Sequence, residues 1–201
     1  MEKPIFQFLN LIFDVVALGL IWLLFSIPII TIGASTTALF YVTTRRISDR
    51  EGYLFKDFLS SFTANIKKAT LLWLLWLILV AIILANIYVL VYLGLYPTMV
   101  AILLPLQICV LIELYFTLLY LFPLTARFEM GFAETIKTAF IMANKHILAT
   151  LSCIGTAIVV TVVCLAFPPL FVVAMGAYAF ITSHRFMQVF KKYRPEIDLD
   201  F

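Results

Sequence analysis

Charged residues are scarce in this chain of 201 residues. Asp, Glu, Lys and Arg make up 12% of it, whereas hydrophobic residues make up 64% and the mean hydropathy is +1.10. A soluble domain has about 25% charged and about 45–50% apolar residues, and one core of this size cannot bury so large an apolar excess. The composition excludes soluble globular, disordered and disulfide-rich secreted proteins and predicts an integral membrane protein.

Cysteine and histidine are also rare, and catalytic motifs are absent. Cys109, Cys153 and Cys164 lie in apolar stretches without C-x-x-C spacing, and His146 and His184 are the two histidines. We therefore expect no disulfide and no metal centre. The sequence has no Walker loop, G-x-G-x-x-G, G-x-S-x-G or H-E-x-x-H. It predicts a protein that is not an enzyme and has no cofactor, so active transport would need a partner or an ion gradient.

The chain contains long stretches without charged residues. Residues 15–44 and 147–183 contain no Asp, Glu, Lys or Arg, and residues 69–126 contain only Glu113. A helix that crosses the bilayer needs about 20 residues, so each stretch is too long for one crossing and fits two if a turn divides it. Turn residues divide the stretches at Pro28, at Gly94 to Pro97 and at Phe167 to Pro169.

These divisions predict an all-α, polytopic membrane helix bundle that forms a single transmembrane domain over residues 1–201. The expected crossings are about 7–27, 31–46, 69–93, 98–125, 147–167 and 170–190. The count is six, or five if the first stretch crosses once, because segment 28–44 can be a full crossing or a re-entrant piece.

The basic residues predict the orientation. All but one of the 14 Lys and Arg residues lie in stretches 45–68, 127–145 and 185–194, and the turns at Tyr96 and Pro168 have none. By the positive-inside rule these stretches are cytoplasmic, and so are both termini. Their basic side chains are suited to anionic lipid headgroups, and we expect no nucleic-acid partner.

Two cytoplasmic stretches have helical hydrophobic periodicity. They predict amphipathic helices at about 54–67 and 131–145, placed along the membrane surface or under the bundle. Their apolar faces are candidates for docking a cytoplasmic partner, and they include Phe55, Phe58, Phe62, Phe132, Ile136 and Phe140.

Short segments spread along the whole chain resemble the YesL-like family of bacterial membrane proteins of unknown function. They are Pro28, the run from Gly33 to Val42, Gly52, Phe55 to Phe58 with Asn65, and Phe122 to Glu129. The resemblance implies a multi-pass protein of the bacterial cell membrane with a role near carbohydrate uptake by ATP-binding-cassette importers. It implies no catalytic residues.

Glu113 is the first candidate functional residue, because a carboxylate near the middle of a crossing is costly and needs a partner. Thr117 and Tyr120 share its helical face and complete a candidate intramembrane polar site. The site can serve an ion, proton or substrate, or Glu113 can simply hold helices together through a hydrogen bond. Asp14 is expected to be an interfacial acid, with pairing to a cytoplasmic Arg as the alternative.

Small residues form a second candidate site. Gly33, Ala34, Thr37 and Ala38 have the spacing that lets helices approach closely, for packing within the chain or for self-association. Alternatively, Pro28 and Gly33 can open a helix and free backbone carbonyls for a ligand.

These observations favour a non-enzymatic accessory or structural subunit, associated with a bacterial carbohydrate-uptake system. The alternative is a small stand-alone transporter or channel with Glu113 in its pathway. The expected partners are the lipid bilayer and either the subunits of an importer or a second copy of the chain.

Overall fold

Helices account for almost all of the residues that the structure describes. The computed structural model describes residues 4–47, 53–92 and 97–193, and this part contains no β-strand. Its elements are α1 (Pro4–Phe25), η1 (Ile29–Thr31), α2 (Ile32–Ile47), α3 (Leu54–Tyr92), α4 (Pro97–Arg127), α5 (Phe132–Lys145), α6 (Ile147–Ala166), η2 (Pro168–Leu170) and α7 (Phe171–Lys191). The all-α prediction is confirmed. Most of the predicted turn at Gly94 to Pro97 lies outside the described residues.

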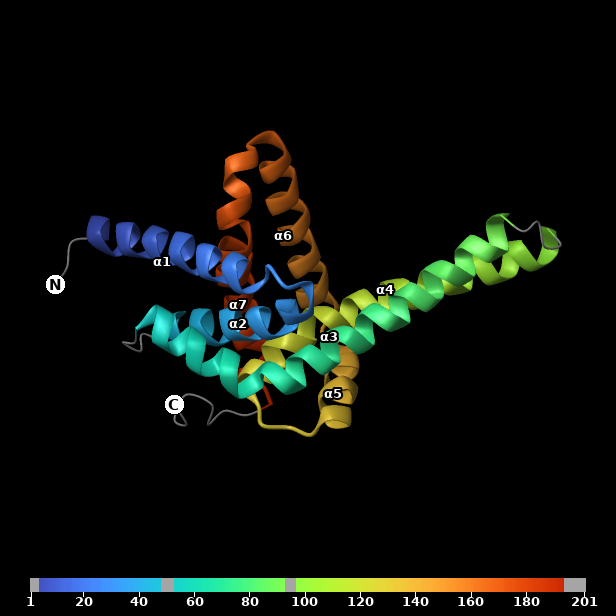
Figure 1. The fold of residues 1–201 in the computed structure, drawn as a ribbon, viewed down its shortest axis with the longest axis horizontal. Helices are drawn as coiled ribbons and strands as arrows, with labels where there is room; N and C mark the ends of the chain where they lie inside the picture. Colours follow the sequence, from blue (N-terminus) through green and yellow to red (C-terminus); the bar gives the residue numbers. More distant parts are fainter. Residues whose placement is uncertain (1–3, 48–52, 93–96, 194–201) are drawn as a thin grey trace.

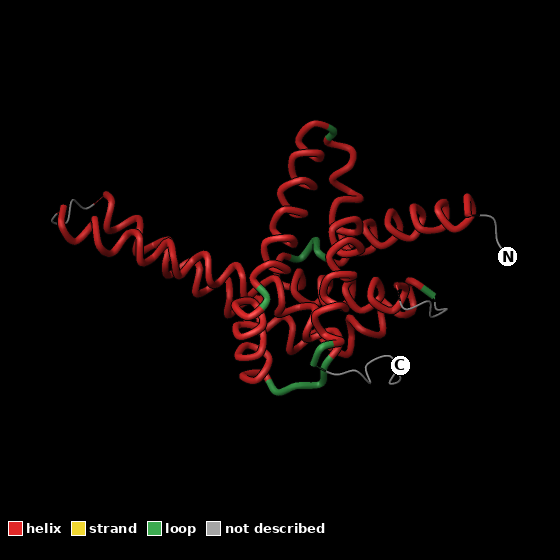
Figure 2. The backbone as a smooth tube through the Cα atoms, turned by 180° about the vertical axis from the view of Figure 1, so that it is seen from behind, coloured by secondary structure: helices red, strands yellow, loops and turns green. Residues whose placement is uncertain are grey.

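In the part of the chain that the structure describes, four helices are long and apolar enough to cross a membrane: Leu54–Tyr92, Thr98–Arg127, Ile147–Ala166 and Pro168–Lys191. They form two helical hairpins, α3 with α4 and α6 with α7, which point in different directions from a common base (Figure 1). Figure 2 shows the same two hairpins from behind. Their length and composition support the prediction of a membrane protein.

Two elements that we predicted as separate form one helix in the structure. We predicted a surface helix at 54–67 and a crossing at 69–93, but α3 is one continuous helix from Leu54 to Tyr92. No Gly or Pro lies between Leu54 and Tyr92 to end it. The charged residues Lys67 and Lys68 therefore lie inside the helix and do not end it.

Helix α2 lies at the centre of the base. It packs against α1, α3, α4 and α7, and most of its residues are buried. Its hydroxyl groups join it to its neighbours: Trp22 Nε1 donates to Thr36 Oγ1 over 3.1 Å, and the Oγ1 of Thr43 lies 2.8 Å from the Oγ of Ser183 on α7. Segment 28–44, whose course the sequence left open, is thus a 3₁₀ turn followed by a short helix enclosed by other helices.

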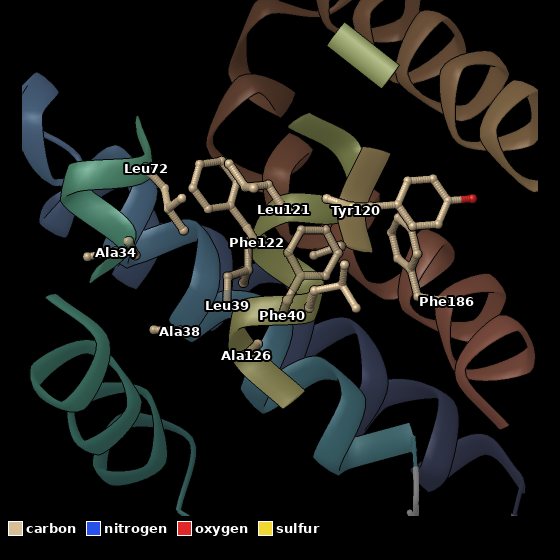
Figure 3. Close-up of a cluster of buried hydrophobic side chains, with 14 of the residues drawn as sticks. Ala34, Ala38, Leu39, Phe40, Leu72, Tyr120, Leu121, Phe122, Ala126 and Phe186 are labelled. Carbon is tan, nitrogen blue, oxygen red and sulfur yellow. The ribbon is translucent and has the colours of Figure 1, made fainter. Parts of the chain in front are cut away.

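The core surrounds α2 and is rich in aromatic rings. Phe186 of α7 is 2% exposed, and its ring centroid lies 5.7 Å from that of Phe40 and 5.1 Å from that of Tyr120. Figure 3 shows these side chains converging between α2, α4 and α7. Ala34 and Ala38 are fully buried in the same cluster.

Glycines set the closest helix contacts. A Cβ on Gly176 of α7 would lie 2.3 Å from the Val15 carbonyl oxygen of α1, and one on Gly19 would lie 2.5 Å from the Val172 carbonyl oxygen. A Cβ on Gly33 would lie 2.5 Å from the Ala69 carbonyl oxygen of α3. Each contact is between backbones, so only glycine permits these approaches.

Candidate functional site

Glu113 joins α4 to α5. Its Oε1 accepts a hydrogen bond from Asn144 Nδ2 over 2.6 Å. Helix α5 packs against α4, and this bond links its last turn to the middle of α4. The carboxylate therefore has the partner that its position demands, from a residue 31 positions away that the sequence analysis did not pair with it.

The other two members of the predicted polar site do not converge with Glu113. Thr117 Oγ1 donates to the Glu113 backbone carbonyl over 2.9 Å and so bonds within its own helix. Tyr120 is fully buried, and its hydroxyl accepts from Thr150 Oγ1 of α6 over 3.2 Å. The three side chains make separate contacts: Glu113 links α4 to α5, Tyr120 links α4 to α6, and Thr117 bonds within α4.

We expect Glu113→Ala and Asn144→Ala to destabilise the protein to a similar extent, by about 1 kcal/mol each, because each removes the same hydrogen bond. The double variant should then cost less than the sum of the two single variants. Thermal unfolding of the four proteins in detergent measures this coupling. Strictly additive losses would contradict a direct bond.

The small-residue site lies in the helix-packed base. Ala34, Thr37 and Ala38 are buried like Gly33, and the Thr37 hydroxyl donates to the Gly33 carbonyl over 2.9 Å. Gly33 contacts Ala69 and Trp73 of α3. These residues join α2 to α3 within one chain, so in this structure they offer no free surface to a second copy.

The six predicted docking residues divide into two groups. Phe58 and Phe62 are buried, with ring centroids 5.4 Å and 5.0 Å from that of Phe25 on α1. Ile136 is partly buried against the core. Phe55, Phe132 and Phe140 are 55%, 40% and 47% exposed. Only these three are available to a partner.

Two ion pairs tie α2 to its neighbours. Asp14 is 5% exposed, and its Oδ2 lies 2.6 Å from Arg46 Nε, while Arg45 Nη1 lies 3.1 Å from Asp57 Oδ1 of α3. The pairing that the sequence analysis held as the alternative for Asp14 is therefore the one present. Both arginines come from the last turn of α2, so the end of this helix is fixed to α1 and α3.

A polar cluster lies where α5 meets α6. His146 Nε2 lies 2.9 Å from the Tyr193 hydroxyl, and Lys145 Nζ lies 5.0 Å from the centre of the Tyr193 ring. Partial burial lowers the pKa of His146, and the positive charges of Lys192 and Lys145 lower it further.

We expect stability to fall as the pH drops through about 6.5, the usual value for histidine, because the folded protein binds this proton less readily than the unfolded chain does. The contribution of His146 to the free energy of unfolding is complete above its pKa in the unfolded chain. It is lost as the pH falls toward the lower pKa of the folded protein, and below that pKa it changes no further. His146→Gln should remove this part of the pH dependence of the melting temperature, whereas His184→Gln should leave it in place. Identical profiles for wild type and His146→Gln would contradict the prediction.

An apolar cleft lies between the two hairpins. Its volume is about 860 Å³, and α2 and α4 form one side of it while α6 and α7 form the other. Its lining includes Trp22, Phe40, Trp73, Phe122 and Met175, and it includes no Asp, Glu, Lys, Arg or His. Glu113 and Tyr120 are not among its lining residues. The sequence analysis missed this cleft because its walls come from seven separate elements.

Within the described residues, no three His, Cys, Asp or Glu side chains lie close enough together to hold a metal ion. The three cysteines are free: Cys109 is exposed, Cys153 is buried and Cys164 lies in the cleft wall. The candidate site therefore consists of hydrogen-bonded contacts between helices and an apolar cleft.

Part of the chain matches the model of a known protein family. No curated protein and no solved structure matches the chain. The YesL-like resemblance is not tested by these comparisons and stays a prediction. Residues 15–87, which run from α1 through the central α2 into α3, match the family described as "Protein of unknown function, DUF624".

Proposed function

We propose that the protein is a non-enzymatic integral membrane protein that acts as an accessory or structural subunit beside a bacterial carbohydrate-uptake system. The observation that carries the proposal is the use of Glu113, which bonds to Asn144 and fixes α5 to α4. The acid most suited to a transport pathway is thereby committed to holding a helix in place, and that helix exposes Phe132 and Phe140.

The internal polar contacts support the same role. Asp14 pairs with Arg46, and Arg45 pairs with Asp57. Such contacts between helices stabilise a fixed arrangement, and exposed aromatic side chains are frequent anchors of protein interfaces. The partner class, an ATP-binding-cassette importer, comes from the YesL-like resemblance.

The proposal includes a topology. Six crossings with both termini in the cytoplasm of a bacterial cell place the basic ends of α2, α4 and α7 on the inner side. The first turn of α5 and the first turns of α3 then lie at the cytoplasmic surface, and the last turn of α5 reaches the middle of α4. Cysteine labelling tests this, since a residue between Arg45 and Lys68 that is reached from outside the cell would overturn it.

The competing function is a stand-alone transporter that uses Glu113. Proteoliposomes that contain the purified chain alone distinguish the two. An accessory subunit should give no sugar uptake above that of empty vesicles, and Glu113→Gln should change nothing. Uptake that Glu113→Gln abolishes would establish the transporter and refute the accessory role.

Co-purification from native membranes tests the accessory role directly. We expect wild-type protein to recover a membrane transport subunit and the double variant Phe132→Ala/Phe140→Ala to recover much less of it. Phe167→Ala, a matched change of a side chain that is 64% exposed on another surface, should behave like wild type. Equal recovery by all three proteins would contradict docking through α5.

A further inference from the structure

The cleft between the hairpins has a lining chemistry that selects its ligand. No Asp, Glu, Lys, Arg or His side chain lines it, and several of its polar atoms are already bonded inside the protein. Trp22 Nε1 donates to Thr36, Trp73 Nε1 donates to the Ile29 carbonyl over 2.9 Å, and Thr161 Oγ1 donates to the Ala157 carbonyl over 2.8 Å. A sugar or an ion would find few hydrogen-bond partners there, whereas a hydrocarbon needs none.

The size of the cleft separates the possible apolar occupants. A membrane-spanning helix about 10 Å wide and 30 Å long occupies roughly 2,400 Å³. The cleft holds about 860 Å³, so it cannot enclose such a helix from a partner or a second copy. Its volume lies within the range of about 300–1,000 Å³ that is common for small-molecule sites. A flexible, narrow chain is the apolar group that fits.

The position of the cleft gives such a chain access. Its walls belong to all four helices that are long enough to cross a membrane. Leu165 and Phe171, at the tip of the α6–α7 hairpin, line it and are 78% and 64% exposed. The lining of the cleft therefore continues onto exposed apolar side chains at this end of the hairpin.

We propose that this cleft is a binding site for a hydrocarbon chain of a membrane lipid. Because lipid tails are as apolar as the lining, the binding free energy comes from dispersion contacts with the shaped wall more than from removal of apolar surface from water. Lipid binding should therefore depend on the shape of the cleft wall. The inference does not depend on the accessory role proposed above.

Tryptophan fluorescence provides the test, because Trp22 and Trp73 line the cleft and the chain has three tryptophans. Purified protein in detergent is titrated with a phospholipid that carries bromine atoms on its acyl chains. Wild type should show saturable quenching. Ala157→Phe on α6 and Ala174→Phe on α7 should each remove the saturable part, because both residues line the cleft and a larger side chain fills it.

Gly155→Phe is the matched control on α6, because a Cβ there meets no atom within 4 Å. It should keep saturable quenching. Quenching that never saturates, or that is equal in wild type and in both cleft variants, would overturn the proposal. Loss of a dimer in Ala157→Phe without any lipid-dependent quenching in wild type would assign the cleft to a second copy and would also overturn it.

Thiol labelling keeps the test independent of misfolding in the variants. Cys164 lines the cleft and Cys109 is exposed elsewhere, both in the wild-type chain. Added phospholipid should slow alkylation of Cys164 severalfold and leave Cys109 unchanged. Equal effects on both cysteines would count against a site in the cleft.

Discussion

Phe186→Ala is expected to lower the free energy of unfolding by about 3–5 kcal/mol, the cost of removing a large aromatic side chain from a packed core. Phe186 is 2% exposed, and its ring contacts those of Phe40, Tyr120 and Phe190 from three helices. The helices around α2 cannot all move inward to fill the space. The melting temperature in detergent, followed by tryptophan fluorescence, should fall by about 2–4 °C for each kcal/mol lost.

Phe167→Ala is the matched control for this change, since Phe167 is 64% exposed at the end of α6. Its loss should alter stability by about 0.5 kcal/mol or less. Similar melting temperatures for the two variants would show that the aromatic cluster around α2 does not hold the base together.

Gly176→Ala is the second substitution with a large expected effect. The new methyl group would lie 2.3 Å from the Val15 carbonyl oxygen and 3.2 Å from the Gly19 nitrogen. Both are backbone atoms, so α1 and α7 must separate along their contact. We expect a loss of about 1–3 kcal/mol, as for other overpacked positions.

Gly155→Ala is the control, and we expect its effect on the free energy of unfolding to be zero or opposite in sign. Its Cβ meets nothing within 4 Å, and alanine favours a helix over glycine by about 0.5–1 kcal/mol. This variant should melt at the same temperature as wild type or higher. If Gly176→Ala did so as well, the close approach of α1 to α7 would be wrong.

The positions of the helices were largely predictable because charged residues and prolines lie at or near their ends. The predicted segments 98–125 and 147–167 differ by one or two residues from α4 and α6. The continuity of α3 was not predictable from Lys67 and Lys68, since charged residues end an apolar stretch without ending a helix. Helical periodicity also placed Phe58 and Phe62 on one face, but it could not show that Phe25 covers them.

The candidate site was predictable only in part. The cost of a charge in an apolar helix was enough to single out Glu113 and to require a partner for it. The partner Asn144 depends on how α5 folds back along α4, and one sequence does not contain that tertiary contact in readable form. The cleft depends in the same way on the angle between two hairpins.

Photo-cross-linking in native membranes tests the accessory role most directly. A benzophenone amino acid is placed at Phe132 or Phe140, which are exposed on α5, and at Phe167 as the exposed control. We expect a cross-link to a membrane transport subunit from the two α5 positions and none from position 167. No protein cross-link from α5, or the same products from all three positions, would contradict it.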